Sequence, residues 1–135
     1  MDANLEVKEE CTTSFNQLKM DKNLRYIIYK IENESAVTVE KSAPPEASFQ
    51  DFLNDLKKDE PRFVVYDFPY KSRDNLDMNK LVFIHWSPDD APARGKMVYA
   101  SSKESLKRRF VGIYREVQAC SMADLDHEEI SESLR

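Results

Sequence analysis

The chain has 135 residues, of which 41% are hydrophobic and 33% charged, and its formal net charge is −5. These values predict one soluble globular domain that buries its own core. No apolar run is long enough to span a bilayer, and the only two glycines, Gly95 and Gly112, exclude a glycine-rich phosphate-binding loop.

The first third of the chain predicts an amphipathic helix followed by a two-stranded hairpin. Acids lie near the start of this helix and Lys19 lies near its end, which suits the helix dipole. The apolar stripe of the helix is Val7, Cys11, Phe15 and Leu18. Residues 24–31 are apolar on both faces and predict a central strand, and Val37 with Val39 predicts its hairpin partner.

The middle of the chain predicts a second helix and a second hairpin. Ser48 is a good N-cap residue for this helix. The helix would place on one face the side chains of Phe49, Phe52, Leu53 and Leu56. Residues 62–68 and 80–86 predict the third and fourth strands, and the polar residues 70–79 between them predict an exposed hairpin loop.

The last third predicts a long helix, a fifth strand and a final acidic helix. Residues 93–111 are helical by composition, but a capping-box pattern at residues 101–104 predicts that the helix is bent or broken there. Gly112 ends it, and residues 113–119 alternate as a strand. The final helix covers residues 122–134, with apolar positions at Leu125, Ile130 and Leu134. Together these elements predict a mixed five-stranded sheet covered by helices.

The two cysteines and the tryptophan are expected to be packed rather than reactive. Cys11 and Cys120 have no CxxC spacing and no histidine cluster near them, which argues against a disulfide framework and against a zinc site. Buried, reduced thiols in a cytosolic setting are the expectation. Trp86 could serve as a stacking platform for nucleic acid, but it falls in a predicted strand, where aromatic core packing is the default.

Candidates for acid–base chemistry are few. His85 falls in a predicted strand and is expected to be packed, whereas His127 lies among acids and is expected to be solvated. Asp89 and Asp90 lie beside prolines before a helix, so caps and turn residues are expected rather than a catalytic pair. We therefore predict that the chain is not an enzyme and that it needs no cofactor or metal.

One cluster of charge is not explained by core packing. Residues 94–109 contain one acid, Glu104, and six bases, which are Arg94, Lys96, Lys103, Lys107, Arg108 and Arg109. Three of the lysines share one face of an unbroken helix, and apolar residues from Met97 to Tyr99 lie among them. This pattern favours docking against an acidic, partly apolar cleft of a partner rather than nucleic-acid binding. A plain solvated helix face is the alternative.

The sequence resembles the actin-depolymerising factor/cofilin family. The resemblance is carried by residues 86–103 (WSPDDAPARGKMVYASSK), and it extends to residues 15–19, to residues 66–68 and to residues 112–119, so it covers essentially the whole chain. It implies one actin-depolymerising factor homology domain over residues 1–135. The implied fold is α+β, in three α/β/α layers, with a mixed, mostly antiparallel five-stranded sheet sandwiched between helices.

The resemblance also implies function. Family members bind actin monomers and filaments, prefer ADP-actin, and promote filament severing and disassembly in the cytoplasm. We expect a monomeric protein that also binds anionic phosphoinositide lipids in competition with actin. The alternatives are a module of the same fold that binds an actin-related assembly, an adaptor that binds phosphoinositide membranes, and an undetected enzyme.

The family's surfaces can be carried over to positions of this chain. The implied monomer-binding residues are Asn4, Leu5, Val7, Arg94, Lys96, Met97, Lys103, Lys107 and Arg108. The implied filament-binding residues are Lys71, Arg73, Lys80, Glu132 and Arg135. The implied phosphoinositide-binding residues are Lys96, Lys103, Lys107, Arg108 and Arg109.

Two departures from the family pattern carry predictions of their own. Ala3 stands where many members have a phosphorylatable serine, so we expect inactivation by N-terminal phosphorylation to be absent. Met78 stands where a base is expected, and Arg135 is the single base at the C-terminus. We therefore predict weaker filament anchoring and relatively stronger monomer binding.

Overall fold

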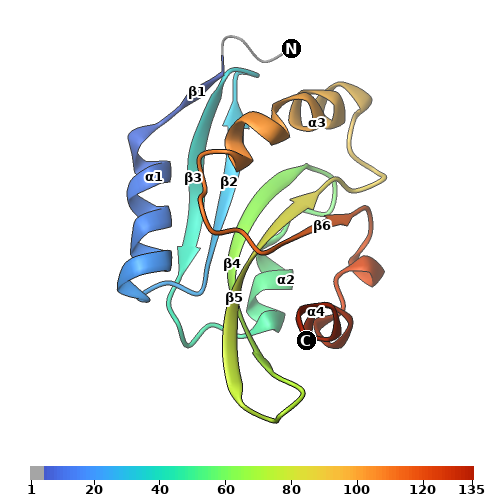
Figure 1. The fold of residues 1–135 in the computed structure, drawn as a ribbon. Coiled ribbons are helices and arrows are strands. Elements are labelled where there is room, and N and C mark those ends of the chain that lie inside the picture. The colour runs from blue at the N-terminus through green and yellow to red at the C-terminus, as the bar shows by residue number, and fades with distance from the viewer. Residues whose placement is uncertain (1–4) are drawn as a thin grey trace.

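A six-stranded sheet forms the middle layer of the computed structural model, which describes residues 5–135 (Figure 1). The strands are β1 (Glu6–Val7), β2 (Tyr26–Glu32), β3 (Ala36–Ala43), β4 (Arg62–Lys71), β5 (Asp77–Trp86) and β6 (Arg115–Ala119). Their order across the sheet is β1-β3-β2-β4-β5-β6. The four central strands pair antiparallel, whereas β1 and β6 pair in parallel at the two edges. The predicted mixed, mostly antiparallel sheet is confirmed, with six strands instead of five.

The additional strand is β1, at a position predicted to be helical. Val7 pairs with Val37 of β3, and the Lys8 N–H donates to the Val37 carbonyl at 3.0 Å. The backbone of this segment is therefore paired with a strand. The residues of the predicted apolar stripe do lie on one side, because Val7 packs against the same core cluster as Cys11 and Phe15. The helix itself begins two residues later, at Glu9.

Helices cover both faces of the sheet, so the predicted three-layer α/β/α arrangement is confirmed. One face carries α1 (Glu9–Asn16), the π-helical turn that follows it (Gln17–Asp21) and α3 (Ala93–Lys107). The other face carries α2 (Phe49–Asp55), a 3₁₀ turn (Met122–Asp124) and α4 (His127–Leu134). None of the helices within residues 5–135 is long and apolar enough to cross a bilayer.

Strand β2 shows why its sequence is apolar on both faces. Ile27 and Tyr29 pack into the core beneath α1 and α3, and Tyr26 and Ile28 pack into the core beneath α2 and α4. All four side chains are buried. Successive side chains of a strand point to opposite faces. A central strand between two helical layers therefore has no polar side, as predicted for residues 24–31.

The long helix α3 is unbroken, which corrects the prediction of a break at residues 101–104. The hydroxyls of Ser101 and Ser102 donate to the Val98 carbonyl at 3.1 Å and 2.8 Å. A serine hydroxyl satisfied within its own helix does not act as a cap. The helix ends at Lys107, and Gly112, at φ 108°, turns the chain into β6.

The second hairpin is longer than predicted. The ladder between β4 and β5 continues to the pair Lys71 and Asp77, so only residues 72–76 form the turn. This end of the hairpin projects beyond the rest of the sheet (Figure 1). Most residues at this end of the hairpin are exposed, so the strand ends carry polar side chains. A sequence pattern assigns such polar residues to a loop.

Smaller predictions have mixed outcomes. Ser48 caps α2, as predicted, and it does so in a reciprocal capping box with Asp51. Cys11 is buried, and its thiol donates to a backbone carbonyl, whereas Cys120 is half-buried. His127 is exposed, but its ring stacks on Phe68 with centroids 4.8 Å apart, so it is not simply solvated.

His85 is buried, as predicted for a packed histidine, and this burial makes stability depend on pH. Its Nδ1 pairs with Gln118 Oε1 at 2.9 Å, and Nε2 has no partner within residues 5–135. Burial lowers the pKa of His85, and the charged side chains that face it are Lys103 and Glu116. The pKa of an unfolded histidine is about 6.5. The stabilising contribution is therefore present above that pH and is lost as the pH falls through the lowered folded-state pKa.

The pH dependence can be tested with His85→Asn. We expect the loss of unfolding free energy between pH 7.5 and pH 5.5, measured by urea denaturation, to be smaller in this variant than in the wild type. The carboxylates that titrate in the same range are common to both proteins, so they cancel in the comparison. An identical pH dependence in the two proteins would contradict the assignment.

Candidate actin-binding surfaces

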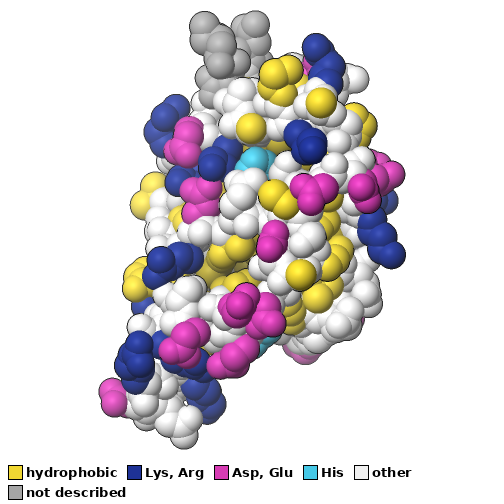
Figure 2. Space-filling model, turned by 90° about the vertical axis from the view of Figure 1, so that its right-hand side faces the viewer, with side chains coloured by type: hydrophobic (Ala, Val, Ile, Leu, Met, Phe, Trp, Pro, Cys, Tyr) yellow, Lys and Arg dark blue, Asp and Glu magenta, His cyan; other side chains and the backbone are white. Residues whose placement is uncertain are grey.

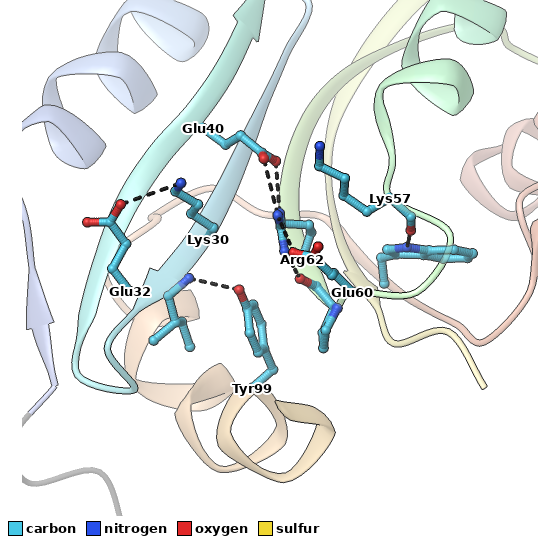
Figure 3. Close-up of polar contacts among 10 residues, drawn as sticks. Lys30, Glu32, Glu40, Lys57, Glu60, Arg62 and Tyr99 are labelled. Atoms are coloured by element: carbon cyan, nitrogen blue, oxygen red, sulfur yellow. Dashed lines mark hydrogen bonds and ion pairs between the residues drawn. The ribbon is translucent and has the colours of Figure 1, made fainter. Parts of the chain in front are cut away.

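Helix α3 is held on the sheet by its buried residues and by a polar cluster beneath it. Tyr99 and Leu106 are buried, and the Tyr99 hydroxyl accepts the Ile31 N–H at 2.8 Å. Figure 3 shows Tyr99 pointing from α3 towards β2 and the cluster around Arg62. Arg62 is 5% exposed and donates to both carboxylate oxygens of Glu40, at 2.8 Å and 3.1 Å. The inner side of α3 is thus fixed, and its outer side is left for a partner.

The N-terminal half of α3 presents both apolar and basic groups. Met97 is 61% exposed, which is unusual for a large apolar side chain. Arg94 is also exposed, and its guanidinium donates to both oxygens of Glu34 at 2.6 Å and 2.7 Å. Lys96 is half-buried and reaches the Asp89 carbonyl at 3.3 Å. An exposed thioether beside two bases fits a partly apolar, acidic cleft.

The C-terminal half of α3 is neutralised more than its sequence indicated. The ammonium groups of Lys103 and Lys107 each lie 2.7 Å from an oxygen of Glu116 on β6. Both lysines are half-buried. Part of the positive charge of the predicted basic cluster is therefore already paired within the molecule at these positions. Glu104 of the same helix also lies 3.8 Å from Lys107, but Glu116 lies on a separate strand, where a helical pattern cannot reveal it.

Arg108 and Arg109 lie just beyond the end of α3 and are exposed. Within the described part of the chain, neither guanidinium has an ion-pair partner. Val111 follows them and is 71% exposed. These two arginines are the bases of the predicted cluster that the fold leaves most available to an anionic partner.

The N-terminal segment lies beside the start of α3. The Glu6 N–H donates to the Ser35 carbonyl at 2.7 Å, and the neighbouring Glu34 pairs with Arg94, so the β2–β3 turn joins the two segments. Leu5 and Val7 are half-buried and pack against the core. Asn4 and Ala3 lie outside the described residues. The structure thus places two parts of the predicted monomer-binding set, the N-terminal segment and the start of α3, side by side.

The predicted filament-binding residues gather where α4 meets the projecting hairpin. The Lys80 ammonium donates to the Leu134 carbonyl at 3.2 Å, and Arg135 Nε donates to the Lys71 carbonyl at 2.7 Å. Arg135 also pairs with Glu132. Arg73 lies in the exposed turn at the hairpin tip. Figure 2 shows basic and acidic side chains intermixed over this lower part of the molecule.

Two further residues of this cluster were missed from the sequence. The Lys80 ammonium lies 3.7 Å from the centroid of the Tyr114 ring, and Tyr114 is 53% exposed. Arg115 donates to the Ser133 carbonyl at 2.6 Å. The sequence does contain a signal for this surface. Tyr114 follows the turn at Gly112, and the alternating pattern of the predicted strand 113–119 does not require its side chain in the core.

The described surfaces are made of ion pairs, bases and exposed apolar side chains. Residues 5–135 contain no group of three or more His, Cys, Asp or Glu side chains arranged to hold a metal ion. Several of the polar clusters are ion pairs between elements, as between α3 and β6, and exposed apolar side chains such as Met97 lie beside bases. Arginine and methionine are enriched at protein–protein interfaces.

The whole described chain matches a known family. Residues 4–135 match the family model described as cofilin/tropomyosin-type actin-binding protein. The chain belongs to the cofilin/actin-depolymerising factor family. Cofilin of Mycosarcoma maydis is 36% identical over 130 residues, which cover 96% of this chain and 94% of that protein. Actin-depolymerizing factor 12 of Arabidopsis thaliana is 42% identical over 119 residues, which cover 88% and 86%.

Solved structures agree with this membership. The crystal structure of Streptomyces griseoflavus cofilin matches with a TM-score of 0.88 at 37% identity, covering 97% of this chain and 99% of that one. The resemblance of residues 86–103 to the cofilin family is confirmed. In this member the signature runs from the buried Trp86, through the connector before α3, to Lys103 in the second half of the helix.

Proposed function

We propose that this chain binds actin, both as monomer and in filaments, and promotes the disassembly of filaments. The observation that carries the proposal is the outer face of α3, where an exposed methionine lies among bases in a chain that belongs to a family of actin-binding proteins. The protein acts as a monomer, in the cytoplasm and on the actin cytoskeleton.

The monomer-binding surface comprises the N-terminal segment and α3. Met97 enters the apolar part of the actin cleft, and Arg94 and Lys96 meet acidic groups at its rim. Lys103, Lys107 and Arg108 extend this contact along the helix. Charged rim contacts mainly raise the association rate and make it sensitive to salt.

The filament-binding surface comprises the hairpin and α4, with Lys71, Arg73, Lys80, Glu132 and Arg135. Part of its charge is already used within the molecule, because Arg135 pairs with Glu128 and Glu132 and Lys71 pairs with Asp77. Met78 is 39% exposed and adds no charge. These features support weaker filament anchoring relative to monomer binding. The protein binds one filament geometry more tightly than the other, and it binds ADP-actin more tightly than ATP-actin. This difference in affinity shifts the filament towards disassembly.

Phosphoinositide binding is a second function that the same surface supports. Arg108 and Arg109 are exposed beside the exposed Val111, and basic clusters with apolar neighbours are attracted to anionic membrane surfaces. Lys96, Lys103 and Lys107 add to this cluster. Because the bases are those of the monomer-binding surface, anionic lipid and actin compete.

The test is a titration of ADP-bound and ATP-bound monomeric actin with the wild type and with Lys96→Ala plus Lys103→Ala. We expect the wild type to bind ADP-actin more tightly and the double variant to bind about fivefold to tenfold more weakly, with a shallower salt dependence. The fraction of protein that sediments with vesicles containing anionic lipid should be smaller for the same double variant than for the wild type.

Lys41→Ala is the matched control, because Lys41 pairs with Asp55 on the α2 side of the sheet. It should bind actin like the wild type. Wild-type protein that binds neither monomeric nor filamentous actin would refute the proposal. It would favour a module of the same fold that recognises an actin-related assembly.

A further inference from the structure

We infer that Glu116 is an internal counter-ion of the α3 surface, which positions Lys103 and Lys107 and lowers the attraction of this surface for an anionic partner. The inference rests on the proposed function where it names actin as that partner. The contact itself is a property of the free protein.

The geometry uses both oxygens of one carboxylate. Glu116 is the second residue of β6, an edge strand of the sheet, and its side chain reaches the C-terminal half of α3. Oε2 lies 2.7 Å from the Lys103 ammonium, and Oε1 lies 2.7 Å from the Lys107 ammonium. The exposed fractions of the three side chains are 23% for Lys103, 30% for Lys107 and 26% for Glu116. These ion pairs are thus partly buried and keep some contact with solvent.

The contacts favour the charged forms of Glu116 and Lys107. Burial acts to raise the pKa of Glu116, but the hydrogen bonds from Lys103 and Lys107 outweigh it, so the pKa lies below its ordinary value. The hydrogen bond to Glu116 raises the pKa of Lys107. Glu116 therefore cancels one of the two positive charges of Lys103 and Lys107, in addition to the exposed Glu104, which lies 3.8 Å from Lys107 within the helix.

A partner must compete with this arrangement. Each ammonium has three N–H donors and gives one to Glu116, so an incoming carboxylate can still bind. The incoming carboxylate can bind beside Glu116, which repels it. Alternatively it can displace Glu116 from the lysines, and Glu116 then stays half-buried without its ion pairs. Both routes cost binding energy that free lysines would not cost. Glu116 thus weakens binding while it holds both ammonium groups at defined positions.

Glu116→Gln tests the inference with almost unchanged shape. We expect its affinity for monomeric ADP-actin at low ionic strength to be about threefold to tenfold higher than that of the wild type. The gain should shrink as salt is added, because it comes from a rim charge. Glu116→Asp keeps the charge and should return the affinity towards that of the wild type.

Glu46→Gln is the matched control for net charge. Glu46 is exposed and lies beside α2, on the side of the sheet opposite to α3, and its replacement changes the net charge by the same amount. It should leave affinity unchanged. If Glu116→Gln binds no more tightly than Glu46→Gln, the inference is wrong.

A double-mutant cycle supplies a second, independent readout. Lys103→Ala should weaken actin binding more in the Glu116→Gln background than in the wild type. In the wild type, Lys103 exchanges the Glu116 carboxylate for a carboxylate of actin, whereas in the Glu116→Gln background it has no ion pair with Glu116 to give up. Equal losses in the two backgrounds would overturn the inference. Should Glu116→Gln fold poorly, Glu34→Gln removes the exposed counter-ion of Arg94 and should raise affinity by about twofold.

A measurement without actin separates this inference from the proposed function. At pH 9 the amine of Lys107 should react faster with an acetylating reagent in Glu116→Gln than in the wild type, because its raised pKa returns towards the ordinary value. Lys41 serves as the internal reference. If the wild type binds no actin, the proposed function fails, and this reactivity alone decides whether Glu116 controls the two lysines. If the reactivity of Lys107 is the same in both proteins, Glu116 does not control the lysines and the inference is wrong.

Discussion

Replacing Arg62 with alanine is expected to lower the free energy of unfolding by about 3 kcal/mol, because breaking a largely buried ion pair leaves its partner uncompensated. Arg62 donates to both oxygens of Glu40, to Glu60 at 3.0 Å and to the Pro61 carbonyl at 2.7 Å. The side chain of Glu40 is only 22% exposed, so water replaces these hydrogen bonds poorly. Urea denaturation at pH 7 measures the loss.

The expected loss also depends on pH. The hydrogen bonds from Arg62 lower the pKa of Glu40 below its ordinary value. The stabilisation is therefore present above the unfolded pKa, about 4.3, and it is lost as the pH falls through the folded-state pKa. The difference between Arg62→Ala and the wild type should accordingly narrow below pH 4.

Lys41→Ala provides the comparison, because the Lys41 side chain is 51% exposed in its pair with Asp55. Exposed pairs contribute about 1 kcal/mol or less. Because the Arg62 cluster lies beneath α3, Arg62→Ala should also weaken monomer binding, whereas Lys41→Ala should not (Figure 3). A loss of stability no larger than that of Lys41→Ala would show that the Arg62 cluster does not anchor the helix.

Local sequence patterns predicted most of the fold because burial on one or both faces leaves a periodic trace. Ile27 and Tyr29 lie on one face of β2 and Tyr26 and Ile28 on the other, which fixed this strand as central. Ser48 predicted the start of α2 because its hydroxyl binds a backbone N–H only three residues away. Such contacts are short-range, and a single sequence is sufficient to find them.

The errors arose where a long-range contact competes with a local pattern. β1 exists because β3 offers it a partner, and no local signal distinguishes its two residues from the start of a helix. The serines of α3 bond back to a carbonyl where their spacing suggested a cap.

The candidate site shows the same limit more strongly. The bases of α3 are evident in the sequence, but Glu34 and Glu116 reach them from the β2–β3 turn and from β6. Composition alone therefore overstates the charge that a partner meets at α3. The long-range ion pairs decide how much of that charge is available.

Replacing Lys80 with alanine is expected to weaken filament binding by about tenfold and to leave monomer binding unchanged. The ammonium is held between the Leu134 carbonyl and the Tyr114 ring, so it is positioned before the filament binds. Burial acts to lower the pKa of Lys80, but its contacts with Tyr114 and Tyr70 outweigh that effect and raise the pKa, so the group stays charged. A positioned cation loses little side-chain entropy on binding.

Co-sedimentation with filaments, alongside titration of monomeric actin, separates the two surfaces. Lys80→Arg keeps the charge over Tyr114 and should retain most of the filament affinity, and Lys41→Ala should behave like the wild type in both assays. Equal losses of monomer and filament binding in Lys80→Ala would mean that the hairpin and α4 do not form a surface separate from α3. A filament affinity that is unaffected by this change would place the filament contact elsewhere on the molecule.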